Sequence, residues 1–250
     1  MKVAKNLYAH LKSGSTSLPA SENNLVLSID KAYDLYFQMM ELIVEVARYA
    51  ESRQQIAKNK KLPSYEDLNP NRRFVDNAVV TLIATSDSVQ KELSERKLSW
   101  AGHDDIIKDI YTQMLETEFY KKYMDAPQSS FSTDRRFVED FYTWLEMNEA
   151  LENEVDDMSI YWGADLGFAL YMVVRTVSTL KQSSTEVKIL PQFKSDEDLD
   201  FAKYLFKKSL VDYESNLEII DKYTRNWDVE RIAFMDNLIL TIAITELTYF

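Results

Sequence analysis

Four carboxylates recur at helical spacing in the middle of the chain: Glu146, Glu149, Glu152 and Asp156. Residues three or four positions apart share one face of a helix, so such a row could in principle supply oxygen ligands to a metal ion. The carboxylate metal sites of helical bundles, however, also use Glu-x-x-His pairs on separate helices. Neither His10 nor His103 has a Glu three residues before it, so the pattern does not predict a metal site.

Other catalytic chemistry is also poorly represented. The chain has no cysteine, which excludes disulfides, thiolate metal sites and cysteine nucleophiles. A Ser-His-Asp triad would have to use His10 or His103, the only two histidines. No Gly-rich phosphate loop is present in the sequence. We therefore predict that the protein is not an enzyme and uses no metal or cofactor.

Charge is distributed unevenly along the chain. The formal net charge of −12 argues against nucleic acid as a partner of the chain by itself, because phosphate binding relies on clustered Lys and Arg. Residues 1–13 nevertheless hold three lysines and no acid, whereas residues 139–157 hold eight acids and no Lys or Arg. The acidic stretch is either a solvated helix face or a docking surface for a basic partner.

No segment of the sequence has the pattern of a membrane span. The N-terminal residues alternate basic and apolar types and lack the continuous apolar core of a signal peptide. Uncharged apolar runs such as 166–174 and 237–245 have nine residues each, which is too short to cross a bilayer. We expect a cytoplasmic protein without a membrane partner.

Composition and periodicity predict an all-α fold. Of the 250 residues 46% are hydrophobic, enough for a substantial core, while 4 Gly and 5 Pro leave little room for the tight turns of a β-sandwich or barrel. A single β-like run, 187–190, has no second strand to pair with. Apolar residues at steps of three and four predict helices over 3–12, 21–61, 72–97, 103–124, 133–156, 160–181 and 195–223, and a last helix from about residue 226 or 228.

That last helix is apolar around most of its girth, which is typical of a helix packed between other helices. Its sequence, together with the residues before it, reads IIDKYTRNWDVERIAFMDNLILTIAITEL over 219–247. This segment resembles the transcription antitermination factor NusB family. The family has a Trp, then a Leu/Val-Glu/Asp-Arg step, then an Ile-Leu-x-x-Ala-x-x-Glu-Leu helix. Here these features fall on Trp227, on 229–231 and on 239–247.

Three further segments are similar to helices of the same family: 2–11, 28–46 and 198–223. The resemblance implies a NusB-like helical bundle with a large helical insertion. We expect N-terminal helices of the bundle over 1–61, the insertion over 62–193, and incomplete C-terminal helices over 194–250. The family normally begins with an Arg-rich segment and continues with two more helices after Glu-Leu. The resemblance therefore implies that this chain lacks both ends of the bundle.

The function that the resemblance implies is not enzymatic. NusB proteins pair with the ribosomal protein NusE and bind boxA-type single-stranded RNA in ribosomal RNA leader transcripts. The pair helps the transcription elongation complex to read through terminators. An acidic helical protein is suited to hold a basic ribosomal protein, since their charges are complementary. A helical scaffold that binds partner peptides without RNA is the alternative.

Candidate RNA contacts follow from positions that match the family. They lie on the first helix and at the turn before the last helix: Lys2, Lys5, Tyr8, Lys222, Tyr223 and Arg225. Lys and Arg would bind phosphates and aromatic rings would stack on bases. The other reading is that both tyrosines pack in the core and both N-terminal lysines are ordinary solvated charge.

The resemblance also implies partner-binding and structural residues. Glu230, Asp236 and Glu246 fall where the family places acids that face NusE or stabilise the motif. The alternative is that these three acids are ordinary exposed residues of a helix, which the sequence does not distinguish from partner contacts. Trp227 reads more readily as a core anchor than as a stacking platform, and Arg231 as a member of a structural ion pair.

Overall fold

The computed structural model describes residues 1–14, 17–223 and 233–250. In these residues the regular structure is α-helical and no strand is present, so the all-α prediction is confirmed. The first seven helices are α1 (Lys2–Ser13), α2 (Leu18–Lys58), α3 (Tyr65–Leu68), α4 (Ala78–Thr85), α5 (Asp87–Arg96), α6 (Asp104–Glu116) and α7 (Glu118–Asp125). The remainder are α8 (Phe131–Leu145), α9 (Glu149–Met158), α10 (Leu166–Ser178), α11 (Asp198–Val211), α12 (Tyr213–Tyr223) and α13 (Phe234–Tyr249).

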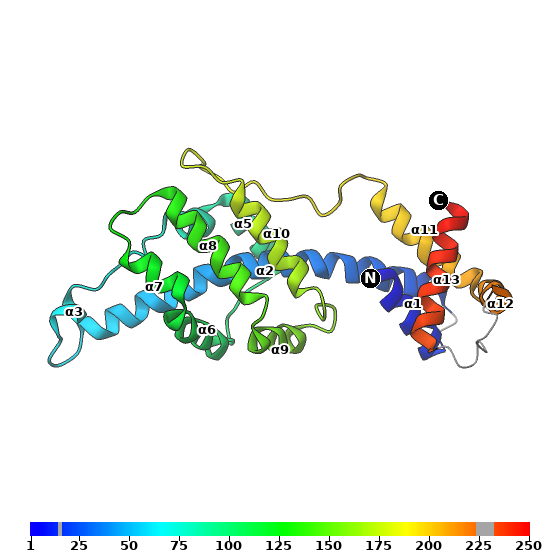
Figure 1. The fold of residues 1–250 in the computed structure, drawn as a ribbon, viewed down its shortest axis with the longest axis horizontal. Coiled ribbons are helices and arrows are strands. Elements are labelled where there is room, and N and C mark those ends of the chain that lie inside the picture. The colour runs from blue at the N-terminus through cyan, green and yellow to red at the C-terminus, as the bar shows by residue number, and fades with distance from the viewer. Residues whose placement is uncertain (15–16, 224–232) are drawn as a thin grey trace. The chain divides into compact units, whose positions relative to one another are not determined.

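The chain divides into two compact units. One, the terminal unit, comprises Met1–Asp30 and Pro191–Phe250, and the other, the central unit, comprises Lys31–Leu190. Helix α2 begins in the terminal unit and continues into the central unit (Figure 1). This division follows contacts between residues, whereas the expected domains 1–61, 62–193 and 194–250 follow family resemblance and remain a prediction.

The terminal unit is built from α1, the start of α2, and helices α11 to α13. Helix α13 packs against α1, α11 and α12. Four fully or nearly fully buried side chains form its centre: Leu7, Leu25, Phe206 and Leu238. Since these come from four different helices, burial of apolar surface is what joins segments more than two hundred residues apart.

The central unit has a larger core around α2. Residues 35–47 of this helix are buried almost without interruption, including the polar Gln38 and Glu41. A helix buried around its whole girth is a central one, with neighbours on every side. Helix α10 packs against α8 (Figure 1). Helix α4 also packs against α8. The Tyr142 hydroxyl on α8 donates to the carbonyl of Met39, 2.9 Å away, and so satisfies a buried polar group.

The longest helix agrees with its prediction. The apolar periodicity predicts a helix over 21–61, and α2 runs over Leu18–Lys58. Pro19 lies in its first turn, where a missing N–H costs no helical hydrogen bond. Downstream, Ser64 and Asp67 form the reciprocal capping box that the sequence indicates, and it opens α3.

Three helices that the sequence predicts as continuous are interrupted in the structure, so these predictions are wrong. The segments 72–97, 103–124 and 133–156 each hold two helices, with breaks at Ser86, Thr117 and 146–148. The Thr117 hydroxyl accepts from the N–H of Tyr120 and starts α7. The Asn148 side chain accepts from the N–H of Leu151 and starts α9. Thr and Asn side chains can cap a new helix at such positions. The spacing of apolar residues is the same whether the helix continues or is interrupted there, so it does not predict the break.

The break at Ser86 depends on a residue far away in the sequence. The Glu186 carboxylate accepts hydrogen bonds from the Ser86 hydroxyl at 2.5 Å and from the N–H of Asp87 at 3.2 Å. An acid at the start of α5 also complements the helix dipole. These hydrogen bonds hold the pKa of Glu186 below its usual value.

The remaining predicted helices need smaller corrections. The segment 195–223 divides at Asp212 into α11 and α12, and 160–181 shortens to Leu166–Ser178. The start expected for the last helix, 226 or 228, lies outside the described residues, and α13 begins at Phe234. Within the described chain no helix combines the length and the hydropathy needed to cross a bilayer.

Candidate nucleic-acid interface

The residues predicted on the first helix lie on α1, whose inner face is fixed by Leu7. Leu7 is fully buried, so residues one or two positions away from it point to other sides of the helix. Lys5 is exposed, and Tyr8 keeps 39% of its surface accessible. The reading of Tyr8 as a ring packed entirely in the core therefore does not fit the structure.

Tyr8 is held by a residue from the other end of the chain. Its ring meets that of Phe234, the first residue of α13, edge to face at 5.5 Å between centroids. The Lys12 ammonium lies 4.1 Å from the centre of the Phe234 ring. We call these three residues, Tyr8, Lys12 and Phe234, the α1–α13 cluster. It combines an accessible aromatic ring with a cation, the two groups that grip a base and a phosphate of single-stranded nucleic acid.

Two members of this cluster were absent from the predicted site. Lys12 stands one turn after Tyr8 on the same helix, a spacing that was visible in the sequence. No sequence spacing points to Phe234, because it lies next to Tyr8 only when α1 and α13 pack together. Long-range packing, not local pattern, makes Phe234 a candidate.

The second part of the predicted site lies at the end of α12. Lys222 and Tyr223 are both exposed, Tyr223 at 74%, and the Lys222 ammonium lies 5.6 Å from the Tyr223 ring centre. The core reading of Tyr223 therefore does not fit either. Arg225 lies outside the described residues. Helices α1 and α12 both pack on α13, so α13 is the common support of both parts.

The predicted partner-binding acids are only partly within the described residues. Asp236 is exposed in the first turn of α13, where an acid also favours the positive end of the helix dipole. Glu246 is exposed near the other end of the same helix. Glu230, and the structural candidates Trp227 and Arg231, lie outside the described residues.

Helix α13 is only partly covered within the terminal unit. Leu238 is fully buried, whereas Ile239 and Leu240 remain 53% and 41% exposed and Leu247 87% exposed. The sequence predicts a helix apolar around most of its girth, and the structure shows apolar side chains on its covered and uncovered faces alike. Exposed apolar surface of this kind marks a region suited to protein contacts.

A second aromatic and cationic group lies beside the same helix. The Lys208 ammonium on α11 sits 4.3 Å from the ring centre of Tyr249, whose hydroxyl donates to Asp212 at 2.7 Å. Hydrogen bonding with Tyr249 raises the pKa of Lys208. This lysine therefore stays charged at neutral pH while tied to a structural contact between α11 and α13.

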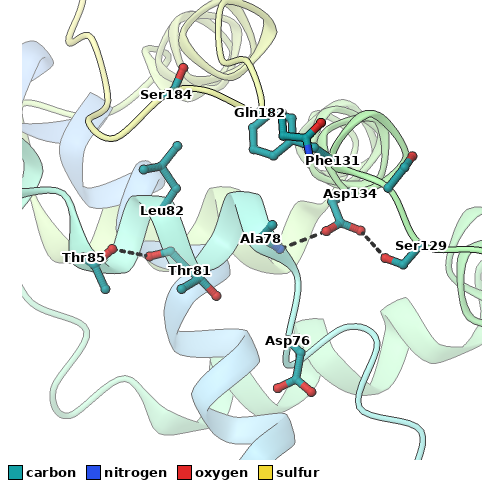
Figure 2. Close-up of a pocket in the computed structure, with 11 residues that line it drawn as sticks. Asp76, Ala78, Thr81, Leu82, Thr85, Ser129, Phe131, Asp134, Gln182 and Ser184 are labelled. Carbon is teal, nitrogen blue, oxygen red and sulfur yellow. Dashed lines mark hydrogen bonds between the residues drawn. The ribbon is translucent and has the colours of Figure 1, made fainter.

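The central unit contains a polar cleft of about 540 Å³ beside the starts of α4 and α8 (Figure 2). Asp134, 4% exposed, accepts hydrogen bonds there from the N–H of Ala78 at 2.9 Å and from the Ser129 hydroxyl at 3.3 Å. It also accepts from the Tyr123 hydroxyl at 2.8 Å, and Tyr123 has a raised pKa, chiefly because of its burial. Asp134 is thus committed to joining α4, α7 and α8.

The four carboxylates at helical spacing, Glu146, Glu149, Glu152 and Asp156, do not form a metal site. Glu146 lies at the end of α8 and Glu149 and Glu152 on α9, with a break between the two helices. Among the residues that the structure describes, no group of three His, Asp or Glu side chains could hold a metal ion. His103 instead contacts Glu154 at 2.5 Å and thereby links the start of α6 to α9.

Comparison with known proteins shows a partial similarity to a NusB protein. A transcription antitermination protein NusB of Salinibacter ruber (strain DSM 13855 / M31) is 35% identical to this chain over 81 residues. The match covers 32% of this chain and 51% of that protein, so the chain spans about half the length of the curated relative. No protein-family model matches the chain, and no solved structure matches it. The similarity supports a NusB-like relationship over part of the chain.

Proposed function

We propose that this protein is a NusB-like, non-enzymatic RNA-binding factor of transcription antitermination in the cytoplasm. The observation that carries the proposal is the 35% identity to a NusB protein over 81 residues. The α1–α13 cluster supports it, because an exposed ring beside a cation suits single-stranded RNA. The partner RNA would be of the boxA type found in ribosomal RNA leaders.

In this proposal each group has a defined task. Lys2, Lys5 and Lys12 neutralise phosphates along α1, and the accessible face of Tyr8 stacks on an unpaired base. The edge-to-face contact with Phe234 limits the motion of the Tyr8 ring in the free protein. The side chain therefore loses less conformational entropy when RNA binds. At the end of α12, Lys222, Tyr223 and Arg225 provide a second set of phosphate and base contacts.

A basic protein partner fits the remaining surface. The chain carries a net charge of −12, which repels RNA but attracts a basic protein such as the ribosomal protein NusE. Glu230, Asp236 and Glu246 would face that partner, while Trp227 and Arg231 stabilise the motif itself. The bound partner adds positive charge beside α1 and raises RNA affinity, which brings the transcription elongation complex and its nascent RNA together.

A scaffold function without RNA is the second candidate. The exposed apolar side chains Ile239, Leu240 and Leu247 of α13 favour it, since they offer a surface to a partner helix or peptide. The two functions differ in one property. A scaffold binds its partners irrespective of RNA, whereas the antitermination factor binds RNA and its protein partner cooperatively.

The test is a salt titration of binding to boxA-like single-stranded RNA, with and without NusE. Loss of one phosphate contact, by Lys5→Gln, should reduce the slope of log affinity against log salt by about 0.7. Lys91→Gln is the matched control, because Lys91 is 69% exposed on α5 in the central unit.

Partner-dependent, salt-sensitive RNA binding that Lys5→Gln weakens and Lys91→Gln leaves unchanged supports the antitermination factor. NusE binding that is indifferent to RNA supports the scaffold. Binding to neither RNA nor NusE overturns the proposal.

A further inference from the structure

A basic segment of the central unit lies at the end of α2 and has no part in the α1–α13 cluster. Residues 52–65 hold four cations and no acid, in a chain whose net charge is −12. The cations are Arg53, Lys58, Lys60 and Lys61. Residues 1–13 share this composition, and clustered cations of this kind are what phosphate binding relies on. We call residues 58–68, from the end of α2 to the end of α3, the α2–α3 tip (Figure 1).

Polar contacts define the path of the chain through the α2–α3 tip. The Lys60 ammonium lies 2.8 Å from the carboxylate of Asp67, which also belongs to the capping box that opens α3. At the base of the tip, the side-chain amide of Gln54 donates to the carbonyl of Asn71 at 3.1 Å. Both contacts join residues on opposite sides of the turn. The tip is therefore an ordered projection of the central unit.

Two lysines and one aromatic ring of the tip are available to a ligand. Lys58 and Lys61 form no ion pair within the residues that the structure describes. Tyr65 is 77% exposed. The four positions from Lys61 to Tyr65 span at most about 14 Å of chain, so one strand can contact both side chains. An accessible ring within reach of unpaired cations is the combination that binds single-stranded nucleic acid.

We propose that the α2–α3 tip is a second contact for single-stranded RNA, independent of base sequence. Tyr65 stacks on an unpaired base, and Lys58 and Lys61 bind neighbouring phosphates. Every base offers a face for stacking and every nucleotide carries a phosphate, so contacts of these two kinds read no sequence. The choice of RNA as the polyanion rests on the proposed function.

The tip also exposes aliphatic side chains, which makes an anionic lipid surface the competing polyanion. Leu62 is 91% exposed, and Leu68 is exposed as well. A segment that inserts into a membrane interface needs a continuous apolar face. Here Glu66 and Asp67 stand between the two leucines, and α3 comprises only four residues. A stacked base needs a single accessible ring, which Tyr65 provides, so single-stranded RNA fits the tip better.

Glu66 makes the proposal testable by a gain of affinity. It follows Tyr65 directly and is exposed, so its carboxylate repels a phosphate near that ring. Glu66→Gln should therefore strengthen RNA binding about threefold at low salt. A merely structural role predicts no such gain, because an acid in the first turn of α3 favours the helix dipole and its removal would loosen the tip.

The experiment measures binding of the full chain to an oligouridylate of about ten nucleotides, which contains no boxA element, at several salt concentrations. Tyr65→Ala should weaken binding about tenfold, as expected for the loss of one stacked ring. The double variant Lys58→Gln/Lys61→Gln should reduce the slope of log affinity against log salt by about 1.4, or about 0.7 for each lost phosphate contact. Phe168→Ala and Lys91→Gln, at exposed positions of α10 and α5, are the matched controls.

Cross-linking then locates the contact on the chain. An oligouridylate that carries 5-iodouridine couples under ultraviolet light to an aromatic ring on which that base stacks. Trypsin releases Tyr65 in the peptide 62–72 and Tyr8 in the peptide 6–12, so mass spectrometry separates the two candidate sites. We expect a cross-link in 62–72 that Tyr8→Ala leaves in place.

Four results would each overturn the proposal: no saturable oligouridylate binding at low salt, binding that neither Tyr65→Ala nor the double lysine variant weakens, cross-links confined to 6–12, or, without any oligouridylate binding, attachment to phosphatidylglycerol vesicles that Leu62→Ser abolishes. Failure of the proposed antitermination function is distinguishable. It would remove the preference for boxA-like RNA and the effect of NusE, and would leave oligouridylate binding at the tip unchanged.

Discussion

Tyr8 and Phe234 meet edge to face with their ring centroids 5.5 Å apart, although 226 positions separate them in the sequence. The contact joins the first helix to the last one and leaves 39% of the Tyr8 surface accessible. A ring that is held by a neighbouring side chain but remains partly accessible is suited to stacking on a base, because binding costs it little further side-chain entropy.

Removal of the Tyr8 ring is expected to weaken RNA binding. Tyr8→Ala should cost about 1–3 kcal/mol in binding to boxA-like single-stranded RNA, the usual contribution of one stacked base. Tyr8→Phe should retain most of the affinity, since stacking uses the ring and not the hydroxyl. Fluorescence anisotropy with labelled RNA measures both variants. Phe168→Ala, at a 60% exposed aromatic residue of the central unit, is the control. Equal affinities of Tyr8→Ala and the unmodified protein would exclude Tyr8 from the RNA site.

Asp134 is expected to be a stability residue of the central unit. Asp134→Ala removes the carboxylate that accepts from the N–H of Ala78 and from the hydroxyl of Tyr123, and both groups lie in or beside the core. The free energy of unfolding should fall by about 2–4 kcal/mol. Urea denaturation measures the change. Asp140→Ala, which removes one partly exposed ion pair with Arg136, should cost less than about 1 kcal/mol. A similar small loss for Asp134→Ala would contradict its role as a link between helices.

Glu186 is expected to make the protein sensitive to acid. Its pKa is lowered in the folded protein by hydrogen bonds from Ser86, Asp87 and Ser88. A lowered folded-state pKa means that the unfolded chain binds more protons, so stability is fully present above the ordinary value of 4.5 and decreases as the pH falls below it. In Glu186→Gln this part of the decrease should disappear. Urea melts between pH 3 and 6 test it, with Glu116→Gln at an 84% exposed side chain as the control.

Glu41 is expected to produce the opposite pH dependence. Its pKa is raised from 4.5 to about 7, mainly because burial disfavours the charged form. The folded protein therefore binds more protons than the unfolded chain between these values, and its stability should fall as the pH rises from about 5 to about 7. Glu41→Gln, which is neutral at every pH, should flatten that fall. Chemical denaturation at closely spaced pH values measures it. An unchanged slope in the variant would show that Glu41 titrates normally.

Several predictions made from residue order alone agree with the structure, and each has a local cause. The all-α class follows from scarce Gly and Pro and from apolar residues at steps of three and four. Helix α2 follows from one uninterrupted run of that periodicity. The capping box of α3 involves residues three positions apart, Ser64 and Asp67. Exposure of Tyr223, by contrast, is a choice between the core and the surface that only the folded chain could make.

The disagreements have a long-range cause. The helix predicted over 72–97 is interrupted at Ser86 because Glu186 reaches back and bonds to the start of α5. Phe234 joins the candidate RNA site because α13 packs against α1. Neither of these pairs is close in the sequence.

The amino-acid order by itself determined the helical class, the extent of the central helix α2 and the absence of cysteine chemistry, since these depend on composition and on spacings within one or two helical turns. Tertiary structure decided where long apolar runs break into separate helices, which aromatic residue accompanies Tyr8, and which distant carboxylate bonds to the start of α5. The physical reason is that a hydrogen bond or ring contact between distant segments forms only after burial of apolar side chains has brought those segments together.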